Sequence, residues 1–515
     1  MNAGNCTSIA EYLQLDFDDK TVRIQNSCPV AVLKGSWKHM GRQYAAQAHR
    51  PIRYHIASQL GMALAMYKSY EAAYAVLPEY EAMLQEVFPE YLQFVRGMQE
   101  GLAEAGFDIA YEDVLIGYIS LAKPDPQEAC AAGTVWQKDG EGKVSQVWAG
   151  IHSDSPYVSN YAHPAVLAYP DGAHAFISFT GFTNGYLNDA GLVCMSTAGS
   201  AAGPGDIRKG LPICISLLYN AAFSVNAEQA AARSVEKLRV GSGEICHFSD
   251  AQGGAVILET TAAHYALRRS GDFEEGNFLI QSNSYLTAEM QSSGGQDPRN
   301  VYRYDSIFRY LKERGEILDL DVLREALSNT SYYDKERDAW ICEWKRATGV
   351  WSPERKDTVR GPAMRRMFEP ASLTAWILMG AEDPLISKLP QATGAYGRIR
   401  LLDSPARTAA EALEQARICL WYAARDMDLA RDIRERGLMP GQLGGRELPQ
   451  ARMAHLDAAR EEIYRAVNWQ TLAGAAACEQ EQLALLGKSI TASLAAQCHA
   501  KAAQSGDPAR LLREE

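Results

Sequence analysis

The spacing of apolar residues changes along the chain, and this change constrains the fold class more than any other feature. From about residue 35 to 121, apolar residues recur every three or four positions, which is typical of amphipathic helices. Pro78 and Pro89 interrupt this pattern. From 133 to about 260 the period is two, as in KVSQVWAG, AHAFISFTG and GLVCMSTAG. The sequence therefore predicts packed helices followed by a strand-rich, largely antiparallel block.

Helices also interrupt and follow the strand-rich block. Helical spacing and central alanines occur in 211–238, and VYRYDSIFRYLKERGEILDLDVLREALSN predicts two helices broken at Arg-Gly. ASLTAWILMG and YGRIRLL predict a further pair of strands, and beyond Ser404 the pattern is helical to the end. This order favours an α+β fold with layered α/β/β/α packing over a regular βαβ series.

The length and composition are those of a globular chain with more than one packed unit. The 515 residues are 47% hydrophobic and 22% charged. We expect a helical N-terminal segment over 1–129, a sheet-and-helix core over 130–405 and a helical C-terminal subdomain over 406–515. The apolar stretch ICLWYAA in the last segment suits packing against another surface, such as the mouth of a site or a homo-oligomer interface.

The charge and the cysteines exclude several classes of partner and site. A net charge of -12 is spread along the chain, so neither nucleic acid nor an anionic membrane is expected as a partner. The N-terminus lacks the pattern of a secretory signal, and no apolar run approaches a membrane span, so we expect a cytoplasmic protein. Ten cysteines without a CxxC pair argue against a disulfide framework and a zinc ribbon.

Cys130, in EACAAGTVW, is the candidate nucleophile. The chain has no GxSxG, HExxH, GxGxxG or GxxxxGK[ST] motif to support other common reaction classes. A thiol at the first position of a strand could present its sulfur and, after cleavage of the chain before it, its own α-amine to one carbonyl. An α-amine with a pKa of about 8 can act as the base. The alternative is an inert, buried cysteine, which is the usual state of this residue.

The segment around Cys130 resembles the cysteine N-terminal nucleophile (Ntn) hydrolases. In that superfamily a cysteine begins a strand, and a turn leads to a second strand that ends in a G-[RQ]-N-x-D-[WF] type segment. Here Cys130, TVWQKDGEGKVSQVWA and GIHSDS occupy those places. Asp154 matches the family aspartate, whereas His152 stands where asparagine is usual. The resemblance is to the group of acyl-CoA:6-aminopenicillanic acid acyltransferase (peptidase family C45) and, more distantly, to choloylglycine hydrolases and phospholipase B-like proteins.

Later segments extend this resemblance over roughly residues 28–405. GFTNGYLNDAGLVCMSTAG resembles the family's glycine-rich lead into N-x-x-G-[LV]-x-[VC], in which Asn188 and Gly191 match. Thr197 stands at the following strand end, where the family often has asparagine. FLIQSNSYL resembles the family's strand end with Asn283, and VYRYDSIFRYL resembles its helix start with Arg303. Upstream, GSWKHMGRQYA and FVRGMQEGLAEAG resemble the helical pro-region.

The resemblance implies a four-layer Ntn sandwich, made as a precursor and cut between Ala129 and Cys130. Cys130 would then form a thioester with an acyl amide or an acyl-CoA-like substrate, with no metal or cofactor. The catalytic group that it implies is Cys130, Asp154 holding the freed amine, Thr197 and Asn283 as oxyanion donors, and Arg303 setting the local electrostatics. The substrate-binding positions are His152, Asn188 and Ser196.

Other readings remain open for the chain as a whole. It could be an unprocessed binding protein that keeps an Ntn fold without catalysis. It could also be a metal hydrolase, because His152 and Asp154 alternate on a strand and His163 or His174 could join them. Cys6, in the segment NCTS, resembles the start of a choloylglycine hydrolase, but no turn and no G-x-N-x-D segment follow it.

Single residues also have structural alternatives. Asp154 is a common turn residue, and Asn283 between two serines could occupy a turn as well. Thr197 suits a strand through its β-propensity alone. Arg303 could be a solvated charge on a helix.

Overall fold

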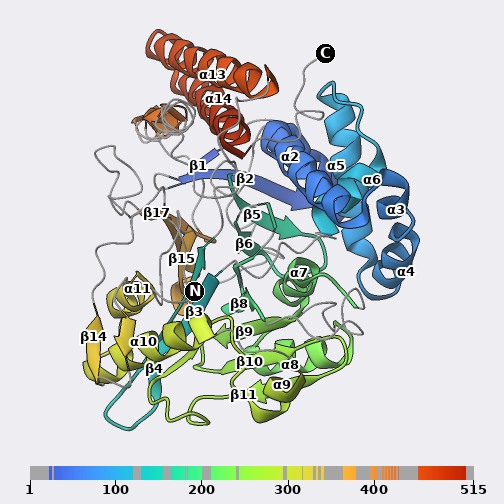
Figure 1. Cartoon of the computed structure of the whole chain (residues 1–515). Coiled ribbons are helices and arrows are strands. Elements are labelled where there is room, and N and C mark those ends of the chain that lie inside the picture. Colours follow the sequence, from blue (N-terminus) through green and yellow to red (C-terminus); the bar gives the residue numbers. More distant parts are fainter. Residues whose placement is uncertain are drawn as a thin grey trace. The chain divides into compact units, whose positions relative to one another are not determined.

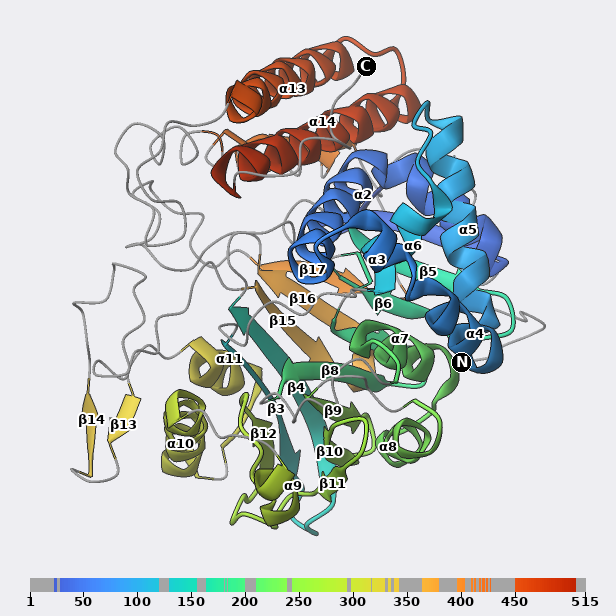
Figure 2. The same cartoon turned by 45° about the vertical axis from the view of Figure 1, so that its right-hand side comes forward.

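The structure is a computed structural model of the whole chain, shown in Figures 1 and 2. It describes residues 23–25, 28–119, 129–154, 164–179, 181–182, 184–199, 210–238, 243–293, 298–315, 317–328, 332–334, 338–341, 364–378, 396–402, isolated positions between 409 and 427, and 450–505.

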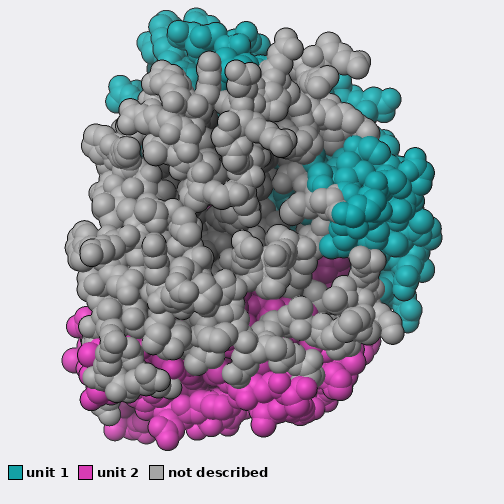
Figure 3. Space-filling view, in the orientation of Figure 1, with its two compact units in different colours: residues 1–123, 157–182, 397–515 teal, residues 124–156, 183–396 magenta. Residues whose placement is uncertain are grey.

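The chain divides into two compact units, which are coloured separately in Figure 3. Unit 1 comprises residues 1–123, 157–182 and 397–515, and unit 2 comprises 124–156 and 183–396. The expected three consecutive segments therefore differ from these units: the N- and C-terminal parts belong to one unit, together with 157–182. All the described residues of the candidate site lie in unit 2.

Unit 1 is mainly helical. Its elements are β1 (Arg23–Gln25), β2 (Cys28–Gly35), α2 (Trp37–Tyr67), α3 (Tyr70–Tyr74), α4 (Leu77–Val87), α5 (Pro89–Glu104), α6 (Tyr111–Ile119), β5 (Ala165–Pro170), β6 (Phe176–Ser178), α13 (Gln450–Gly474) and α14 (Glu479–Ser505). β2 lies parallel to β5, which joins residues about 135 positions apart and which the sequence pattern did not indicate.

Helices α2 and α5 approach closely because each has a glycine that faces the backbone of the other helix. A side chain on Gly41 would collide with the Phe94 carbonyl, and one on Gly97 would collide with the Lys38 carbonyl. The helical spacing predicted for this part of the chain is thus confirmed, with the two proline interruptions at the second residue of α4 and the first residue of α5.

Unit 2 contains groups of consecutive strands separated by pairs or triplets of α-helices. Its elements are β3 (Ala129–Lys138), β4 (Val144–Asp154), β7 (Tyr186–Asn188), β8 (Leu192–Ala198), α7 (Ile213–Phe223), α8 (Ala227–Glu236), β9 (Glu244–Asp250), β10 (Ala255–Thr260), β11 (Tyr265–Arg268), β12 (Phe278–Gln281), α9 (Ala288–Ser293), α10 (Pro298–Arg314), α11 (Leu320–Ser328), β13 (Tyr332–Asp334), β14 (Ala339–Ile341), β15 (Met364–Glu369), η3 (Pro370–Ser372) and β16 (Thr374–Leu378). β17 (Tyr396–Arg400) begins at the boundary with unit 1.

Two sheets of unit 2 position the candidate site. One contains β12, β3, β4, β15 and β16 in that order, and the other runs from β7 through β8, β9 and β10 to β11. Helices α10 and α11 contact β12, β3 and β4, whereas α7 and α8 contact strands of the second sheet (Figure 2). β3 contacts β8 and β9 of the other sheet. A mixed helix and sheet fold is therefore present, as predicted.

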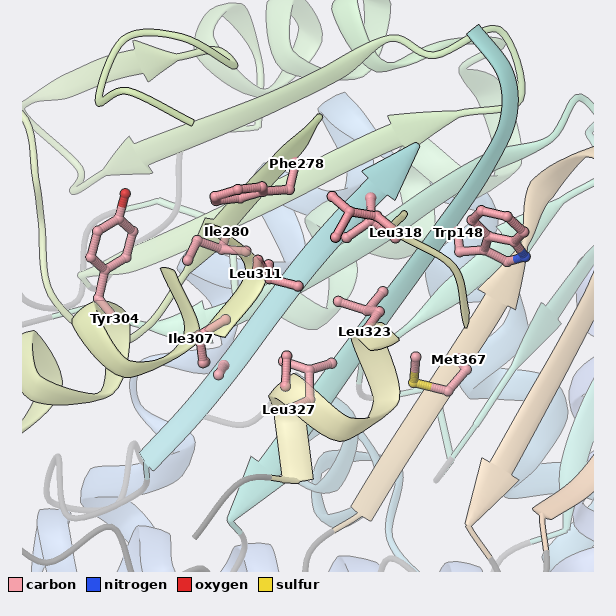
Figure 4. Close-up of a cluster of buried hydrophobic side chains, with 13 residues drawn as sticks. Trp148, Phe278, Ile280, Tyr304, Ile307, Leu311, Leu318, Leu323, Leu327 and Met367 are labelled. Atoms are coloured by element: carbon pink, nitrogen blue, oxygen red, sulfur yellow. The ribbon is translucent and has the colours of Figure 1, made fainter. Parts of the chain in front are cut away.

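The outer face of the β3–β4 sheet packs against α10 and α11. Figure 4 shows this cluster, which includes Phe278 and Ile280 of β12, Leu311 of α10, Leu323 of α11 and Met367 of β15. Two glycines, Gly133 of β3 and Gly150 of β4, are cross-strand partners beneath it. A side chain at Gly150 would collide with Met367 of β15. Because neither glycine has a side chain, side chains of β15 and of the covering helices can pack directly on the two strands.

Other predicted elements have the expected type. The two helices predicted after residue 300 are α10 and α11, and the break falls at Gly315, whose φ of 69° favours glycine. The predicted strands at ASLTAWILMG and YGRIRLL are β16 and β17. No helix among the described residues combines the length and apolar character that crossing a membrane requires. The cytoplasmic location stays a prediction.

Candidate functional site

Cys130 is the second residue of β3 and lies near the open end of the β3–β4 hairpin. The register pairs Ala129 with Asp154 and Cys130 with Ser153. At the other end, the side chain of Asp139 accepts hydrogen bonds from the backbone nitrogens of Glu141 and Lys143, which closes the turn between the strands. The strand, turn and strand expected for TVWQKDGEGKVSQVWA thus form a hairpin that fixes the position of Cys130, which is 7% exposed and not in a disulfide.

Cys130 faces the second sheet. Side chains alternate along a strand, and Ala131 and Val135 belong to the cluster under α10 and α11. Trp136, on the opposite face of β3, packs with Ile245 of β9. The Thr134 hydroxyl lies 2.8 Å from Nε2 of His247, which is also on β9. Cys130 shares the face of Thr134 and Trp136, so its side chain is directed between the sheets.

Two side chains hold the backbone of Cys130, because the neighbouring strand β12 ends before it reaches this residue. Gln281 is the last residue of β12 and pairs with Ala132, so Asn283 continues the register opposite Cys130. The backbone N–H of Trp136 donates to the carbonyl of its partner Asn277. In an antiparallel pair of strands, every second residue pair exchanges main-chain hydrogen bonds, so Cys130 and its partner Asn283 would be expected to do the same. At Cys130, the N–H instead donates to Oδ1 of Asn283 at 2.5 Å, and the carbonyl accepts from Nη1 of Arg303 at 3.3 Å.

The neighbours of Asn283 define the orientation of its amide. Oδ1 faces the N–H of Cys130, while Nδ2 donates to the carbonyl of Ala198 at 2.6 Å. A flipped amide would place donor against donor and acceptor against acceptor. Asn283 therefore holds the backbone nitrogen of Cys130 in the uncleaved chain, and it also ties β3 to β8 of the second sheet. Within the described part of the chain, the second hydrogen of Nδ2 has no acceptor, and the oxyanion role stays a prediction.

Thr197 stabilises the segment that carries Asn283. Its hydroxyl donates to the carbonyl of Ser282 at 2.7 Å and accepts from Nε2 of Gln281 at 3.2 Å. A threonine hydroxyl has a single hydrogen, and here the Ser282 carbonyl takes it. In this arrangement Thr197 positions the end of β12. Its role as an oxyanion donor stays a prediction.

Arg303 lies in the second turn of α10 and is buried. Its contact with the carbonyl of Cys130 places a positive charge beside the predicted nucleophile. The alternative of a solvated helix charge is wrong, because only 3% of this residue is exposed.

Ala129 and Asp154 are described through their main chains. They pair with each other at the end of the hairpin, so the Ala129–Cys130 peptide bond lies inside the strand ladder. Their side chains lie outside the described residues. The part of Asp154 in holding an amine therefore stays a prediction.

His152 lies on the sheet face opposite Cys130. It pairs with Ala131 in the register, and its Nδ1 accepts a hydrogen bond of 3.0 Å from Nε of Arg365 on β15. A guanidinium at one ring nitrogen disfavours a metal cation there. Among the described residues, no group of three or more His, Cys, Asp or Glu side chains could hold a metal ion. His163 lies outside the described part of the chain.

Asn188 and Ser196 are not brought to Cys130 by their contacts. The Asn188 amide accepts from the backbone nitrogens of Ala190 and Leu192 and donates to the carbonyls of Ala221 and Ser224. These four bonds use the full hydrogen-bonding capacity of the amide and close the β7–β8 turn, which is a structural role. Substrate binding by Asn188 stays a prediction.

Ser196 alternates with Thr197 along β8, so its side chain is directed away from the β3 sheet. Its backbone is held by the side chain of Asn184, which accepts from the Ser196 nitrogen at 3.1 Å and donates to the Ser196 carbonyl at 2.8 Å. Substrate binding by Ser196 stays a prediction.

Gln281 and His247 are site neighbours that the sequence did not single out. Gln281 donates to Thr197 and, at 2.9 Å, to the Ile245 carbonyl, so it joins β12 to the second sheet. Burial, with a smaller effect from the Arg268 charge, lowers the pKa of His247 to about 3. His247 is therefore a neutral hydrogen-bonding partner of Thr134 near neutral pH. Both residues occur in regular strand patterns that give no chemical signal.

Comparison with known proteins gives one curated relative and a set of solved structures. No protein-family model matches the chain. A protein of Archaeoglobus fulgidus, described as uncharacterized, is 24% identical over 334 residues. That match covers 56% of this chain, and the chain spans about half (52%) of the relative's length.

Two crystal structures of variants of conjugated bile acid hydrolase from Clostridium perfringens are similar to 53% and 54% of this chain, with TM-scores of 0.29 and identities of 11% and 10%. They are matched over 87% and 88% of their own lengths. At this TM-score the likeness does not assign a fold or an activity.

Proposed function

We propose that the protein is a cysteine amidohydrolase or acyltransferase of the Ntn class, activated by cleavage between Ala129 and Cys130. The observation that carries this proposal is the pair of hydrogen bonds to Cys130. Asn283 Oδ1 accepts from the nitrogen of Cys130, and Arg303 donates to its carbonyl. These two side chains take the place of the main-chain hydrogen bonds that β12 makes with β3 before it ends. The order of helices, sheet, sheet and helices in unit 2 supports the proposed four-layer sandwich.

In the activation step, Sγ of Cys130 attacks the carbonyl carbon of Ala129. The C–N bond breaks, and the nitrogen of Cys130 takes a proton and becomes an α-amine, which leaves Ala129 as a thioester on Sγ. Water hydrolyses this thioester, which frees the thiol and leaves a carboxylate on Ala129. An amide nitrogen cannot act as a base, so the cleavage creates the base of the mature enzyme.

In the substrate reaction, the α-amine takes the thiol proton while Sγ bonds to the carbonyl carbon of an acyl amide. The proton then passes to the departing amine, which leaves an acyl thioester on Cys130. Water or a second amine accepts the acyl group and restores the thiol. Asn283 Oδ1 accepts a hydrogen from the α-amine and so directs the nitrogen's lone pair. No cofactor takes part, and an acyl-CoA-like thioester would serve as donor in the transferase reaction.

Trapping the acyl-enzyme tests this proposal. The purified chain is incubated with a panel of chromogenic acyl amides and acyl thioesters, and the mass of the Cys130 peptide is measured after acid quenching. We expect an acyl adduct on Cys130 that hydroxylamine removes, and no adduct or turnover in Cys130→Ala. Turnover that persists in Cys130→Ala but stops on chelation would instead support the metal hydrolase, and an inert chain would support a binding protein.

A further inference from the structure

A buried charge cluster lies beside β12 in unit 2. Nη1 of Arg268 lies 2.6 Å from Oε1 of Glu275, and its Nε lies 3.5 Å from Oε1 of Glu259. The side chain of Arg268 is 1% exposed, and both carboxylates are fully buried. Replacing a buried ion pair with apolar residues is often neutral or stabilising, so stability alone is a weak reason for this cluster. The hydrogen bonds that its members make to β12 and α10 indicate a role in positioning these two elements.

The cluster ties down both ends of the segment that carries Asn283. Nη2 of Arg268 donates to the carbonyl of Ile280 at 2.6 Å, three residues before Asn283. On the other side, Glu259 accepts hydrogen bonds from the backbone nitrogen of Leu286 at 2.9 Å and from the nitrogen and hydroxyl of Thr287. Arg268 and Glu259 thereby limit the movement of the intervening turn.

The same cluster is joined to α10 through Tyr304. The Tyr304 hydroxyl donates at 3.1 Å to Oε1 of Glu275, the oxygen that also accepts from Arg268. Burial and the Glu275 charge raise the pKa of Tyr304 well above its usual range, so the phenol keeps the proton that it donates. Tyr304 follows Arg303 in α10, and Figure 4 shows it beside Ile307 at the edge of the apolar cluster.

We propose that Arg268, Glu275 and Tyr304 are positioning residues for Cys130. Through Glu275 they fix α10 and β12 to each other, so that Arg303 and Asn283 meet the carbonyl and the nitrogen of the same residue. Removal of the Tyr304 hydroxyl then loosens both contacts at Cys130 while it leaves the reacting groups in place. The consequence for chain cleavage rests on the proposed function, whereas the link itself can be measured in a chain that cannot be cleaved.

Amide hydrogen exchange in the uncleavable Cys130→Ala chain tests the link directly. Tyr304→Phe should speed exchange of the backbone amide at position 130 about fivefold, as expected for the loss of one hydrogen bond. The matched control is Tyr310→Phe, which removes from the same helix a hydroxyl that donates to the exposed Glu325. In this control, exchange at position 130 should stay within about twofold of the parent. Exchange in β9 and β10 should not change in either variant.

Cleavage kinetics and a conservative variant complete the test. In the chain with Cys130, Tyr304→Phe should slow cleavage about fivefold, and this effect should be smaller in an Arg303→Met background, since only part of it acts through Arg303. Glu275→Gln keeps an acceptor for Tyr304 and Arg268 and should retain more activity than Glu275→Leu. Unchanged exchange at position 130 in Tyr304→Phe would overturn the inference. An uncleaved wild-type chain would overturn the proposed function alone, because the exchange measurement would still decide the link.

Discussion

The backbone nitrogen of Cys130 donates a hydrogen bond to Oδ1 of Asn283, 2.5 Å away, although 153 positions separate the two residues. Asn283 also donates to the Ala198 carbonyl on the second sheet. One side chain thus sets the nitrogen of the proposed nucleophile relative to both sheets of unit 2. The predictions below depend on this arrangement.

Asn283→Ala should lower the rates of chain cleavage and of acyl-enzyme formation about 100-fold, because the nitrogen of Cys130 loses its fixed acceptor. Asn283→Asp keeps the acceptor oxygen but places a second oxygen against the Ala198 carbonyl, so an intermediate rate is expected. Rates are measured by intact-mass analysis of freshly purified chains over time. A wild-type rate in Asn283→Ala would remove Asn283 from the site.

Thr197→Val should act mainly on stability. The variant keeps the side-chain shape but loses the hydrogen bonds to Ser282 and Gln281, which should lower the free energy of unfolding by about 1–2 kcal/mol. Thr197→Ser, which retains the hydroxyl, is the control, and urea unfolding gives the difference. If Thr197→Val unfolds like the wild type but reacts about 100-fold more slowly, the hydroxyl acts on the oxyanion after all.

Asn188→Ala should destabilise unit 2 without a selective effect on substrate binding. The change leaves two backbone nitrogens and two carbonyls without their partner, at a cost of about 3 kcal/mol. Urea unfolding measures this loss, and KM should be unchanged at a temperature where the variant is folded. An increase in KM with normal stability would favour the substrate-binding role that the sequence indicated.

His247 should make stability depend on pH. Its pKa is about 3 in the folded chain and 6.5 ordinarily, so between these values the unfolded chain binds a proton that the folded chain does not. The free energy of unfolding therefore falls as the pH drops below 6.5, by about 1.4 kcal/mol per pH unit. Between pH 7 and 5 the wild type should lose about 2 kcal/mol more than His247→Gln. Equal losses in denaturant unfolding would show that His247 is not buried as a neutral ring.

Local sequence patterns predicted the elements around the site. Alternation and the DGEG turn predicted the hairpin that presents Cys130, and the Arg-Gly break correctly separated α10 from α11. These features depend on neighbours within a few residues, where side-chain periodicity and turn preference act. The position of Cys130 near the start of a strand could therefore be inferred without a structure.

The roles within the site depend on register and therefore could not be predicted. Asn283 meets the nitrogen of Cys130 because β12 ends at Gln281 and its register continues by two residues. Whether Thr197 reaches a substrate or the Ser282 carbonyl depends on the packing of two sheets. Arg268 and Glu275 are only seven positions apart, but their importance lies in contacts to Ile280 and Tyr304.

Cleavage of the chain before Cys130 tests the central claim most directly. The wild-type protein and Cys130→Ala are purified in parallel, incubated and analysed by denaturing mass spectrometry. The account predicts that the wild type separates into residues 1–129 and 130–515, with a free α-amine on Cys130, while Cys130→Ala remains one chain of 515 residues. A wild-type chain that stays intact and does not react with a thiol-directed acyl probe would contradict it.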